Sequence, residues 1–382
     1  MEPSDLAARH EAVARYDFRG VHPNLRFGTA SDRYAGWLGQ VYPEDRWAER
    51  VATRTKRLGG DTFQERTLPV ESTADYFRHF SVVELDFTFY RPLADEDGGP
   101  TPNRFVLERY AEHAPDTARF LLKAPQAYTA RTVRQSQEAL DAAARTDESL
   151  APKGRGPKGG RGRGNRPVYV PNPTYLDAKG FTERFLAPAV DVLGDRLAGV
   201  IFEQEYARVR ESPPPEAFVG ELDAFFADVP EAVGGRRVQA HLEIRSPHLL
   251  TEPYAAWLEA RGLGFVFSHW TWLPPLAEQW ALAGGRFTAA NGEAVLRLLT
   301  PLRMPYEDAY ALAHPFDAPA PELAAGAEAM VEDAADLARK AVDAGAVLNV
   351  IANNRAFGNA PALDQAVASR FLEHAERVPT DQ

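Results

Sequence analysis

The sequence predicts an α/β fold, a single-domain (β/α)8 barrel of the TIM type. Short apolar runs rich in β-branched and aromatic residues occur near residues 25–29, 82–86, 119–123, 197–203, 236–244, 263–269, 295–299 and 347–352. Helical patterns lie between most of these runs, and such alternation is typical of parallel strands. Eight units fit one closed barrel better than they fit two ordinary domains.

Residues typical of helix boundaries flank the helical segments. Thr101 is a candidate N-cap, because Pro102 follows it in the position of a first-turn proline. Thr251 is a second candidate N-cap, and Gly262 closes the segment that follows it. A threonine N-cap and a glycine after the last turn are typical helix boundaries. These positions therefore predict one helix that begins at Pro102 and another that lies between Thr251 and Gly262.

Composition excludes several classes of function. The chain has 382 residues, 45% of them hydrophobic, with a formal net charge of -11 and no cysteine. Disulfides, thiolate metal sites and cysteine nucleophiles are thereby excluded, and a protein that binds nucleic acid over its whole surface is disfavoured by charge. The acidic start is unlike a signal peptide, and no apolar run approaches the roughly 20 residues of a membrane helix. We expect a cytoplasmic protein without membrane contact.

The expected organisation is an N-terminal extension, residues 1–24, followed by a barrel over 25–376 with a flexible insertion at 131–175. Within that insertion, residues 151–167 are rich in glycine and basic side chains and contain no acid. Such a segment cannot build a core. It follows the third strand, so we expect a loop on the rim of the site that could close over an anionic ligand or bind nucleic acid. The alternative is a solvated insertion without a partner.

Two runs carry charge on one face. In residues 82–90, Glu84 and Asp86 point to the same side because side chains alternate along a strand. In residues 238–245, His241, Glu243 and Arg245 share the face opposite an apolar one. An antiparallel strand with one hydrated face would show the same pattern. In a barrel, however, polar residues where strands end predict a site.

The strand ends supply the candidate site residues. Those expected to act in catalysis are Glu84, Asp86, Lys123, Glu243 and Arg245. Those expected to contact a ligand are Tyr90, Glu203, Glu205, His269, Trp270, Asn353 and Asn354. We expect Glu243 and Arg245 to form the energetic centre, with Lys123 as the cation beside Glu243 or Glu84.

Four motifs together resemble the YecE-like family, also called domain of unknown function 72. They are Val83-Glu84-Leu85-Asp86-Phe87-Thr88-Phe89-Tyr90, Phe120-Leu121-Leu122-Lys123-Ala124-Pro125, Leu242-Glu243-Ile244-Arg245 and Asn353-Asn354-Arg355-Ala356-Phe357-Gly358-Asn359-Ala360. The resemblance implies a TIM-type barrel and matches Glu84, Lys123, Glu243, Arg245, Asn353 and Asn354 to the family's polar positions. It implies no established reaction. The chain departs from the family at Asp86, at Ala130, at 202–206, and after strand seven, where the usual His-Gly-Arg is absent around 300–303.

Several carboxylates beside one Lys, one Arg and one His suit acid–base chemistry, because neighbouring charges separate the pKa values of carboxyl groups. Lys123 could form a Schiff base, but a salt bridge to Glu84 or Asp86 is favoured since anionic neighbours keep a lysine protonated. The same oxygen and nitrogen donors suit a divalent metal, which the pattern does not require. Tyrosines and tryptophans near the strand ends could stack on sugar or base rings.

Three functions are consistent with these residues. The leading hypothesis is an enzyme that uses a carboxylate, lysine and arginine pocket for acid–base, possibly hydrolytic, chemistry on a small anionic, sugar-like or nucleotide-like ligand. The second is a nucleic-acid-binding barrel that resembles endonuclease IV-type barrels, with residues 151–167 contacting phosphates. The third is a noncatalytic ligand-binding or scaffold protein. Global acidity counts against the second hypothesis.

Overall fold

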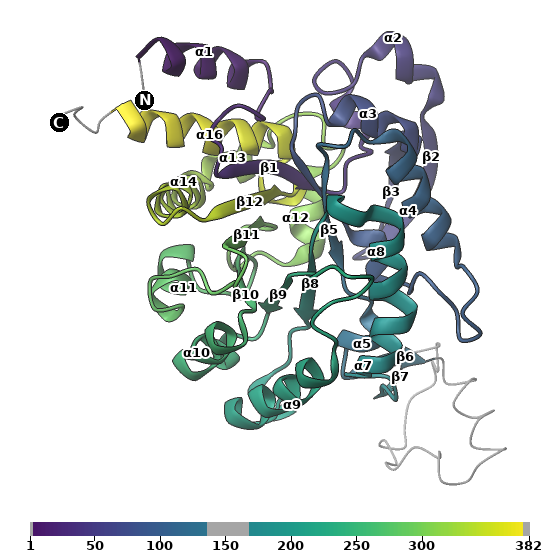
Figure 1. Cartoon of the computed structure of the whole chain (residues 1–382). Coiled ribbons are helices and arrows are strands. Elements are labelled where there is room, and N and C mark those ends of the chain that lie inside the picture. The colour runs from purple at the N-terminus through teal and green to yellow at the C-terminus, as the bar shows by residue number, and fades with distance from the viewer. Residues whose placement is uncertain (1–2, 136–167, 377–382) are drawn as a thin grey trace, which may run out of the picture.

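Eight parallel strands close into a barrel at the centre of the molecule (Figure 1). The computed structural model describes residues 3–135 and 168–376. Around the barrel the strands follow the order β1, β12, β11, β10, β9, β8, β5, β4. Their bounds are β1 Leu25–Ala30, β4 Val82–Leu85, β5 Arg119–Lys123, β8 Leu197–Gln204, β9 Ala240–Ile244, β10 Gly264–His269, β11 Glu293–Leu298 and β12 Val347–Ala352. Each strand falls on one of the runs that the sequence predicts, and the (β/α)8 fold class is confirmed.

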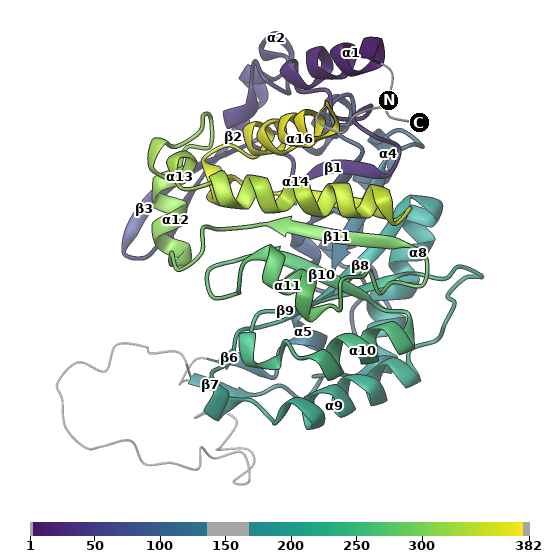
Figure 2. The same cartoon turned by 90° about the vertical axis from the view of Figure 1, so that its left-hand side faces the viewer.

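Helices surround the strands (Figures 1 and 2). The longer ones are α1 Pro3–Ala14, α4 Pro102–His113, α8 Ala187–Leu193, α9 Pro215–Asp228, α10 Glu252–Arg261, α11 Leu276–Leu282, α12 Tyr306–Ala313, α14 Glu328–Asp343 and α16 Ala360–Glu376. The shorter ones are α2 Glu44–Trp47, α3 Thr73–Tyr76, α5 Gln126–Thr129, α7 Ala178–Phe181, α13 Pro321–Ala325 and α15 Asn354–Phe357. Within the described residues, none of the helices combines the length and the apolar character that a membrane crossing demands.

The helix boundaries follow the sequence signals. Thr101 is the N-cap of α4, although its side chain makes no capping bond. Thr251 caps α10 by accepting a hydrogen bond from the amide of Tyr254, and Gly262 ends that helix in the left-handed conformation with φ of 66°. Glycine adopts that backbone without the steric cost that a Cβ atom imposes. Both predicted helix starts are therefore confirmed.

The barrel interior begins with one apolar layer. Seven strands each contribute one residue to it, namely Ala30, Val82, Leu121, Ile201, Val266, Val295 and Ile351. The opposite faces of the strands pack against the helices in a much larger core that includes Phe27, Val83, Phe120 and Leu296. Because side chains alternate along a strand, the residue two positions after each of these members also faces inward, except after Ala30, where β1 ends. That second inward layer forms the base of the site.

The N-terminal helix α1 packs against the last helix, α16 (Figure 1). Val13 on α1 is buried in the main core, and the side chain of Gln365 on α16 donates a hydrogen bond to its carbonyl at 3.0 Å. Residues 3–14 thus cover part of the barrel's outer layer. The sequence alone assigned no role to this extension.

Two antiparallel strand pairs lie outside the barrel, on the same side of it in Figure 2. The first pairs β2 Ala52–Leu58 with β3 Asp61–Thr67, and the second pairs β6 Thr132–Gln135 with β7 Val168–Pro171. The second pair lies at the two ends of the expected insertion 131–175. The basic segment 151–167 lies outside the described residues. The β2–β3 hairpin was not predicted, because its strands alternate polar and charged residues without an apolar face.

Candidate functional site

A pocket of about 830 Å³ opens at the carboxyl ends of the barrel strands. Ten of the twelve candidate residues line it: Glu84, Asp86, Tyr90, Lys123, Glu203, Glu205, Arg245, Trp270, Asn353 and Asn354. The other two, Glu243 and His269, do not line it. This pocket therefore lies at the end of the barrel that the strand pattern indicated, as active sites do in other (β/α)8 barrels.

The base of the pocket is a layer of polar side chains that we call the floor layer. Its members are Glu84, Lys123, Glu203, Glu243, Ser268, Arg297 and Asn353, and each except Glu243 follows a member of the apolar layer by two residues. Glu243 joins them because it is in register with Glu203 on the neighbouring strand β8. All seven are buried. Charges in such a position are stable only when they are paired and hydrogen-bonded.

Arg297 on β11 is the centre of this layer. Its Nε and Nη2 atoms donate to the two carboxylate oxygens of Glu84 at 2.8 and 2.6 Å. Its Nη1 atom lies 3.3 Å from Glu203 and also donates to Glu243. The second oxygen of Glu243 accepts a hydrogen bond from the Ser268 hydroxyl at 2.6 Å. One guanidinium therefore binds three carboxylates from three strands, using the planar fork that distinguishes arginine from lysine.

Glu203 also forms salt bridges with two further cations. The ammonium of Lys123 lies 2.7 Å from it, and the Nη2 atom of Arg245 lies 2.8 Å from it. Burial alone would raise the pKa of Glu203, but Arg245, Lys123 and Arg297 together hold that pKa well below its ordinary value. The expected partners of Lys123, which were Glu243, Glu84 or Asp86, are thus corrected to Glu203. Lys123 forms a salt bridge rather than standing free, and the carboxylate of Glu84 on the neighbouring strand β4 is already paired with Arg297.

The ion pairs of the floor layer converge on Arg297, whereas the sequence led us to expect Glu243 and Arg245 at the energetic centre. Arg245 does contact Glu243, at 3.6 Å, but its side chain is 18% exposed whereas that of Arg297 is 3% exposed. The signal for Arg297 was present in the sequence. It is the single charge within Ala294-Val295-Leu296-Arg297-Leu298, the same alternation that marks Glu84.

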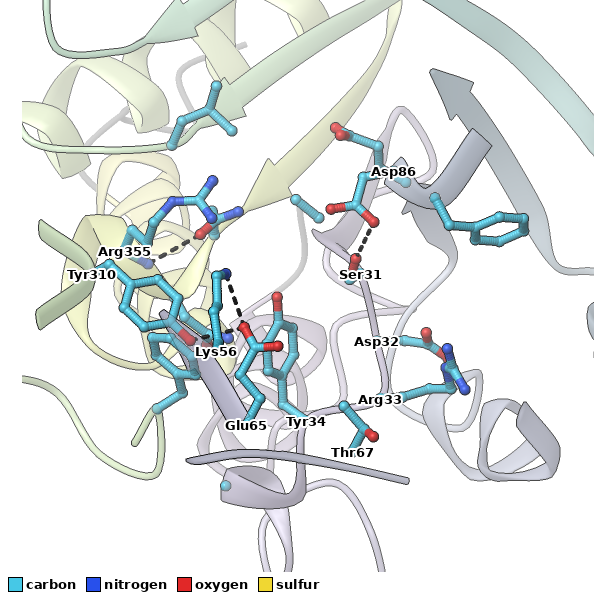
Figure 3. A pocket seen from close by; sticks show the side chains of 18 of the residues that line it. Ser31, Asp32, Arg33, Tyr34, Lys56, Glu65, Thr67, Asp86, Tyr310 and Arg355 are labelled. Carbon is cyan, nitrogen blue, oxygen red and sulfur yellow. Dashed lines mark hydrogen bonds and ion pairs between the residues drawn. The ribbon is translucent and has the colours of Figure 1, made fainter. Parts of the chain in front are cut away.

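Two residues beyond the floor layer, a second set of side chains surrounds the opening of the pocket. This mouth layer consists of Asp86, Glu205, Arg245, Trp270, Leu299 and Arg355, all of which line the pocket. Figure 3 shows Asp86 and Ser31 on one side of the opening and Arg355 on the other. Unlike the floor layer, the mouth layer contains charged groups that are not committed to an opposite charge.

The two carboxylates of the mouth layer have polar neighbours rather than cations. The hydroxyl of Ser31 donates to Asp86 at 2.8 Å, and Ser31 itself has a left-handed backbone with φ of 69°, which is uncommon outside glycine. The amide of Gln126 donates to Glu205 at 2.6 Å. Partial desolvation raises the pKa of Glu205, and the nearby charge of Glu203 adds to this, whereas the Gln126 bond and the more distant charges of Arg245 and Lys123 oppose it. Glu203 and Glu205 thus have pKa values displaced in opposite directions.

Arg355 is the uncommitted cation of the mouth layer. Its guanidinium lies over the ring of Tyr306 at 4.6 Å from the ring centre and donates to the Tyr306 hydroxyl at 3.4 Å. Its Nε atom has no hydrogen-bond partner, and among the described residues no carboxylate lies within 4.0 Å of it. A stacked, oriented guanidinium with free donors is well suited to bind a carboxylate or phosphate.

The β2–β3 hairpin forms one wall of the pocket, through Arg54, Lys56, Gln64, Glu65, Arg66 and Thr67. The Glu65 carboxylate accepts from Lys56 at 2.9 Å and from the hydroxyl of Tyr310 on α12 at 2.8 Å (Figure 3). Lys56 also lies 4.4 Å from the centre of the Tyr310 ring. The wall is thus attached to α12 rather than to the barrel strands.

The other candidate residues have local structural roles. His269 donates a hydrogen bond from Nδ1 to the carbonyl oxygen of Thr300 at 2.8 Å, and it is directed away from the pocket because Ser268 occupies the inward position. Asn353 caps α15 by accepting from the amide of Arg355. Asn354 accepts from Trp37 and from the amide of Ala360. The two asparagines therefore organise the loop that presents Arg355.

A divalent metal does not fit the floor layer. Its carboxylates, those of Glu84, Glu203 and Glu243, are matched by the cations of Lys123, Arg245 and Arg297, whereas a metal ligand must offer a free oxygen. Across residues 3–135 and 168–376, no group of three or more acidic or histidine side chains is arranged to hold an ion.

Comparison with known proteins places the chain in a family. The model of the family described as "Protein of unknown function DUF72" matches residues 26–382. No curated protein matches the chain. A DUF72 family protein from Enterococcus faecalis is 12% identical, with 91% of this chain and 95% of that chain covered and a TM-score of 0.47. One from Thermotoga maritima is 15% identical, with 92% and 99% covered and a TM-score of 0.43. Because the family model spans nearly the whole barrel, the chain belongs to the DUF72 family.

Proposed function

We propose that this protein is an enzyme that performs acid–base hydrolysis on a small, sugar-like ligand that carries an anionic group. The observation that carries the proposal is the composition of the mouth layer. It combines a carboxyl group with a raised pKa, a second carboxylate and an uncommitted guanidinium around one cavity. Pockets that collect such groups are the default candidates for active sites.

The floor layer supports this chemistry without taking part in proton transfer. Its three carboxylates are balanced by Lys123 and Arg297 within the layer and by Arg245 from the mouth layer, so they keep a fixed arrangement at the bottom of the pocket. Such preorganised charges stabilise charge that develops above them without having to reorient. We therefore assign the reaction to the mouth layer, because Asp86, Glu205 and Arg355 have polar atoms that remain available to a ligand in the cavity.

Three side chains of the mouth layer each receive one role. Glu205 donates its proton to the oxygen of the leaving group, because its raised pKa keeps it protonated to higher pH than an ordinary carboxyl. Asp86 accepts a proton from the attacking water, whose oxygen forms the new bond as the bond to the leaving group breaks. Arg355 binds the anionic group of the ligand. Proton and atom counts balance, since one proton enters from Glu205 and one leaves to Asp86.

The experiment is an assay of the full-length protein against p-nitrophenyl glycosides and sugar phosphates, with Glu205→Gln and Asp86→Asn beside the parent. Loss of either group should lower turnover at least 100-fold, the usual scale for a general acid or base. Glu278→Gln, an exposed carboxylate on α11, is the matched control and should leave turnover unchanged. Unchanged turnover in both mouth variants would refute the assignment.

Ligand binding separates catalysis from simple recognition. Arg355→Ala should weaken binding of the anionic ligand, whereas Arg355→Lys should restore the charge but not the planar fork. If a sugar phosphate binds in an Arg355-dependent way and none of the panel is turned over, the pocket is a binding site of a noncatalytic protein.

A further inference from the structure

Three aromatic rings form a strip beside the pocket, which we call the aromatic strip: Tyr206, Trp270 and Trp272. The ring centre of Tyr206 lies 6.2 Å from that of Trp270 and 6.4 Å from that of Trp272, with tilts of 47° and 40°. Tyr206 is 46% exposed and Trp272 is 48% exposed. Rings at such angles do not cover one another's faces, so both exposed faces remain open to a ligand.

Exposure of large apolar side chains is concentrated here. The described residues with such exposure are Tyr90, Phe105, Tyr169, Tyr206, Val209, Trp272 and Leu312. Two of the seven belong to the aromatic strip, and Tyr90 lines the adjoining pocket. Scattered exposed aromatics need no explanation, but a contiguous set at the edge of a cavity points to a binding surface.

The loops that carry the strip are held by hydrogen bonds. The Ser246 hydroxyl accepts from the amide of Ala207 at 2.9 Å, next to Tyr206. Thr271, between the two tryptophans, donates its hydroxyl to the carbonyl of Met304 at 2.8 Å, and its amide donates to Thr300 at 3.0 Å. The rings are thus exposed and yet oriented before any ligand arrives, which lowers the entropic cost of binding.

The strip is continuous with the pocket. Trp270 and Tyr206 line the cavity, while Trp272 lies outside its lining. The guanidinium of Arg245 stacks on Trp270 at 4.9 Å from the ring centre and reaches Glu203 in the floor layer. A chain of contacts therefore runs from the bottom of the pocket over Trp270 to Trp272 at the surface.

We propose that the aromatic strip is a second sugar subsite, so that the ligand is an oligosaccharide with one ring in the pocket and the next ring stacked on Trp272. This rests on the proposed function of the pocket. A flat apolar ring face bordered by hydroxyl groups matches the exposed indole of Trp272, while Glu205, which lines the pocket together with Trp270 and Tyr206, offers a polar group to the hydroxyls of the neighbouring ring. A polyanion would instead approach Glu205 and a chain with net charge of -11.

The experiment measures binding of maltotriose, cellotriose and chitotriose, each as the neutral sugar and in a form with one phosphate group, beside the matching monosaccharide, to the full-length protein by calorimetry and tryptophan fluorescence. We expect at least one trisaccharide to bind about tenfold tighter than its monosaccharide, or about 1.4 kcal/mol. Trp272→Ala should remove that advantage and leave monosaccharide binding intact, whereas Trp272→Phe should keep most of it. Phe105→Ala, which removes an exposed aromatic on α4, is the matched control and should change neither.

Three results would overturn the subsite: no trisaccharide that exceeds its monosaccharide, an advantage that survives in Trp272→Ala, or a dinucleotide that binds more tightly through Trp272 than any of the sugars. The outcome is separable from that of the proposed chemistry. A Trp272-dependent advantage in a protein whose turnover is unaffected by Glu205→Gln would refute the acid–base roles alone. Glu205-dependent turnover without the advantage would refute the subsite alone.

Discussion

Arg297 and Glu84 form a two-point ion pair across the inside of the barrel. Nε lies 2.8 Å from Oε2 and Nη2 lies 2.6 Å from Oε1. The two residues belong to β11 and β4, which are separated around the barrel wall by β12 and β1. The pair therefore connects parts of the wall that share no hydrogen-bonded edge, and both side chains are almost fully buried. Loss of this pair should therefore destabilise both parts of the barrel wall and the site between them.

Replacing Arg297 by alanine should lower the free energy of unfolding by about 3–5 kcal/mol, because three buried carboxylates would lose their common partner. Arg297→Lys should lose less, since it keeps the charge and loses the fork. Urea denaturation of both variants measures the effect. Arg339→Ala, whose guanidinium is 46% exposed on α14, is the control and should change stability by less than about 1 kcal/mol. Equal stability of Arg297→Ala and Arg339→Ala would contradict the central role of Arg297.

Glu203 should make the protein sensitive to acid. Its pKa in the folded state lies below the ordinary value of 4.5, because three cations outweigh the effect of burial. A lowered pKa stabilises the fold above that ordinary value, and the contribution is lost as the pH falls toward the folded pKa. We expect the free energy of unfolding to decline below pH 4.5 more steeply in the parent than in Glu203→Gln. Parallel declines in denaturation series over the acid range would count against this.

Asp364 should make the stability of the protein depend on pH in the opposite direction. Its side chain on α16 is fully buried, its two oxygens have no hydrogen-bond partner among the described residues, and burial raises its pKa well above 3.8. A raised pKa contributes stability at low pH that is lost as the pH rises through the folded value. Asp364→Asn should therefore gain stability relative to the parent as the pH is raised. The control is Asp343→Asn, a carboxylate 66% exposed, which should not gain stability in the same thermal melts.

Phe63 should hold the hairpin wall against α12. Its ring lies 4.9 Å from that of Tyr310 in an edge-on arrangement and 5.3 Å from that of His314. Phe63→Ala should loosen the wall, since an aromatic pair contributes about 0.5–1.5 kcal/mol beyond its buried area. Hydrogen exchange should then accelerate at 52–67 and stay unchanged in the barrel strands. Exchange in Phe105→Ala provides the comparison, and equal protection of the hairpin in both variants would show that Phe63 does not anchor it.

The sequence by itself determined the barrel and the end of it that carries the polar pocket. Each barrel strand appears as an apolar run, and alternation along those runs places Glu84, Glu203 and Arg297 on the inner face. This information is local, because the direction of a side chain on a strand depends only on its position in that strand. The four motifs likewise identified the DUF72 family before any contact was known.

Only the tertiary structure decided which charges meet. Glu84 and Arg297 are 213 residues apart, and local alternation shows that both face inward without showing how far each reaches across the barrel. Lys123 accordingly pairs with Glu203, which no spacing along the chain indicates. The β2–β3 hairpin depends in the same way on contacts with α12, since its own strands offer no apolar face. Partner choice depends on the closed geometry of the barrel, because closure brings strands distant in sequence to within the length of one arginine side chain.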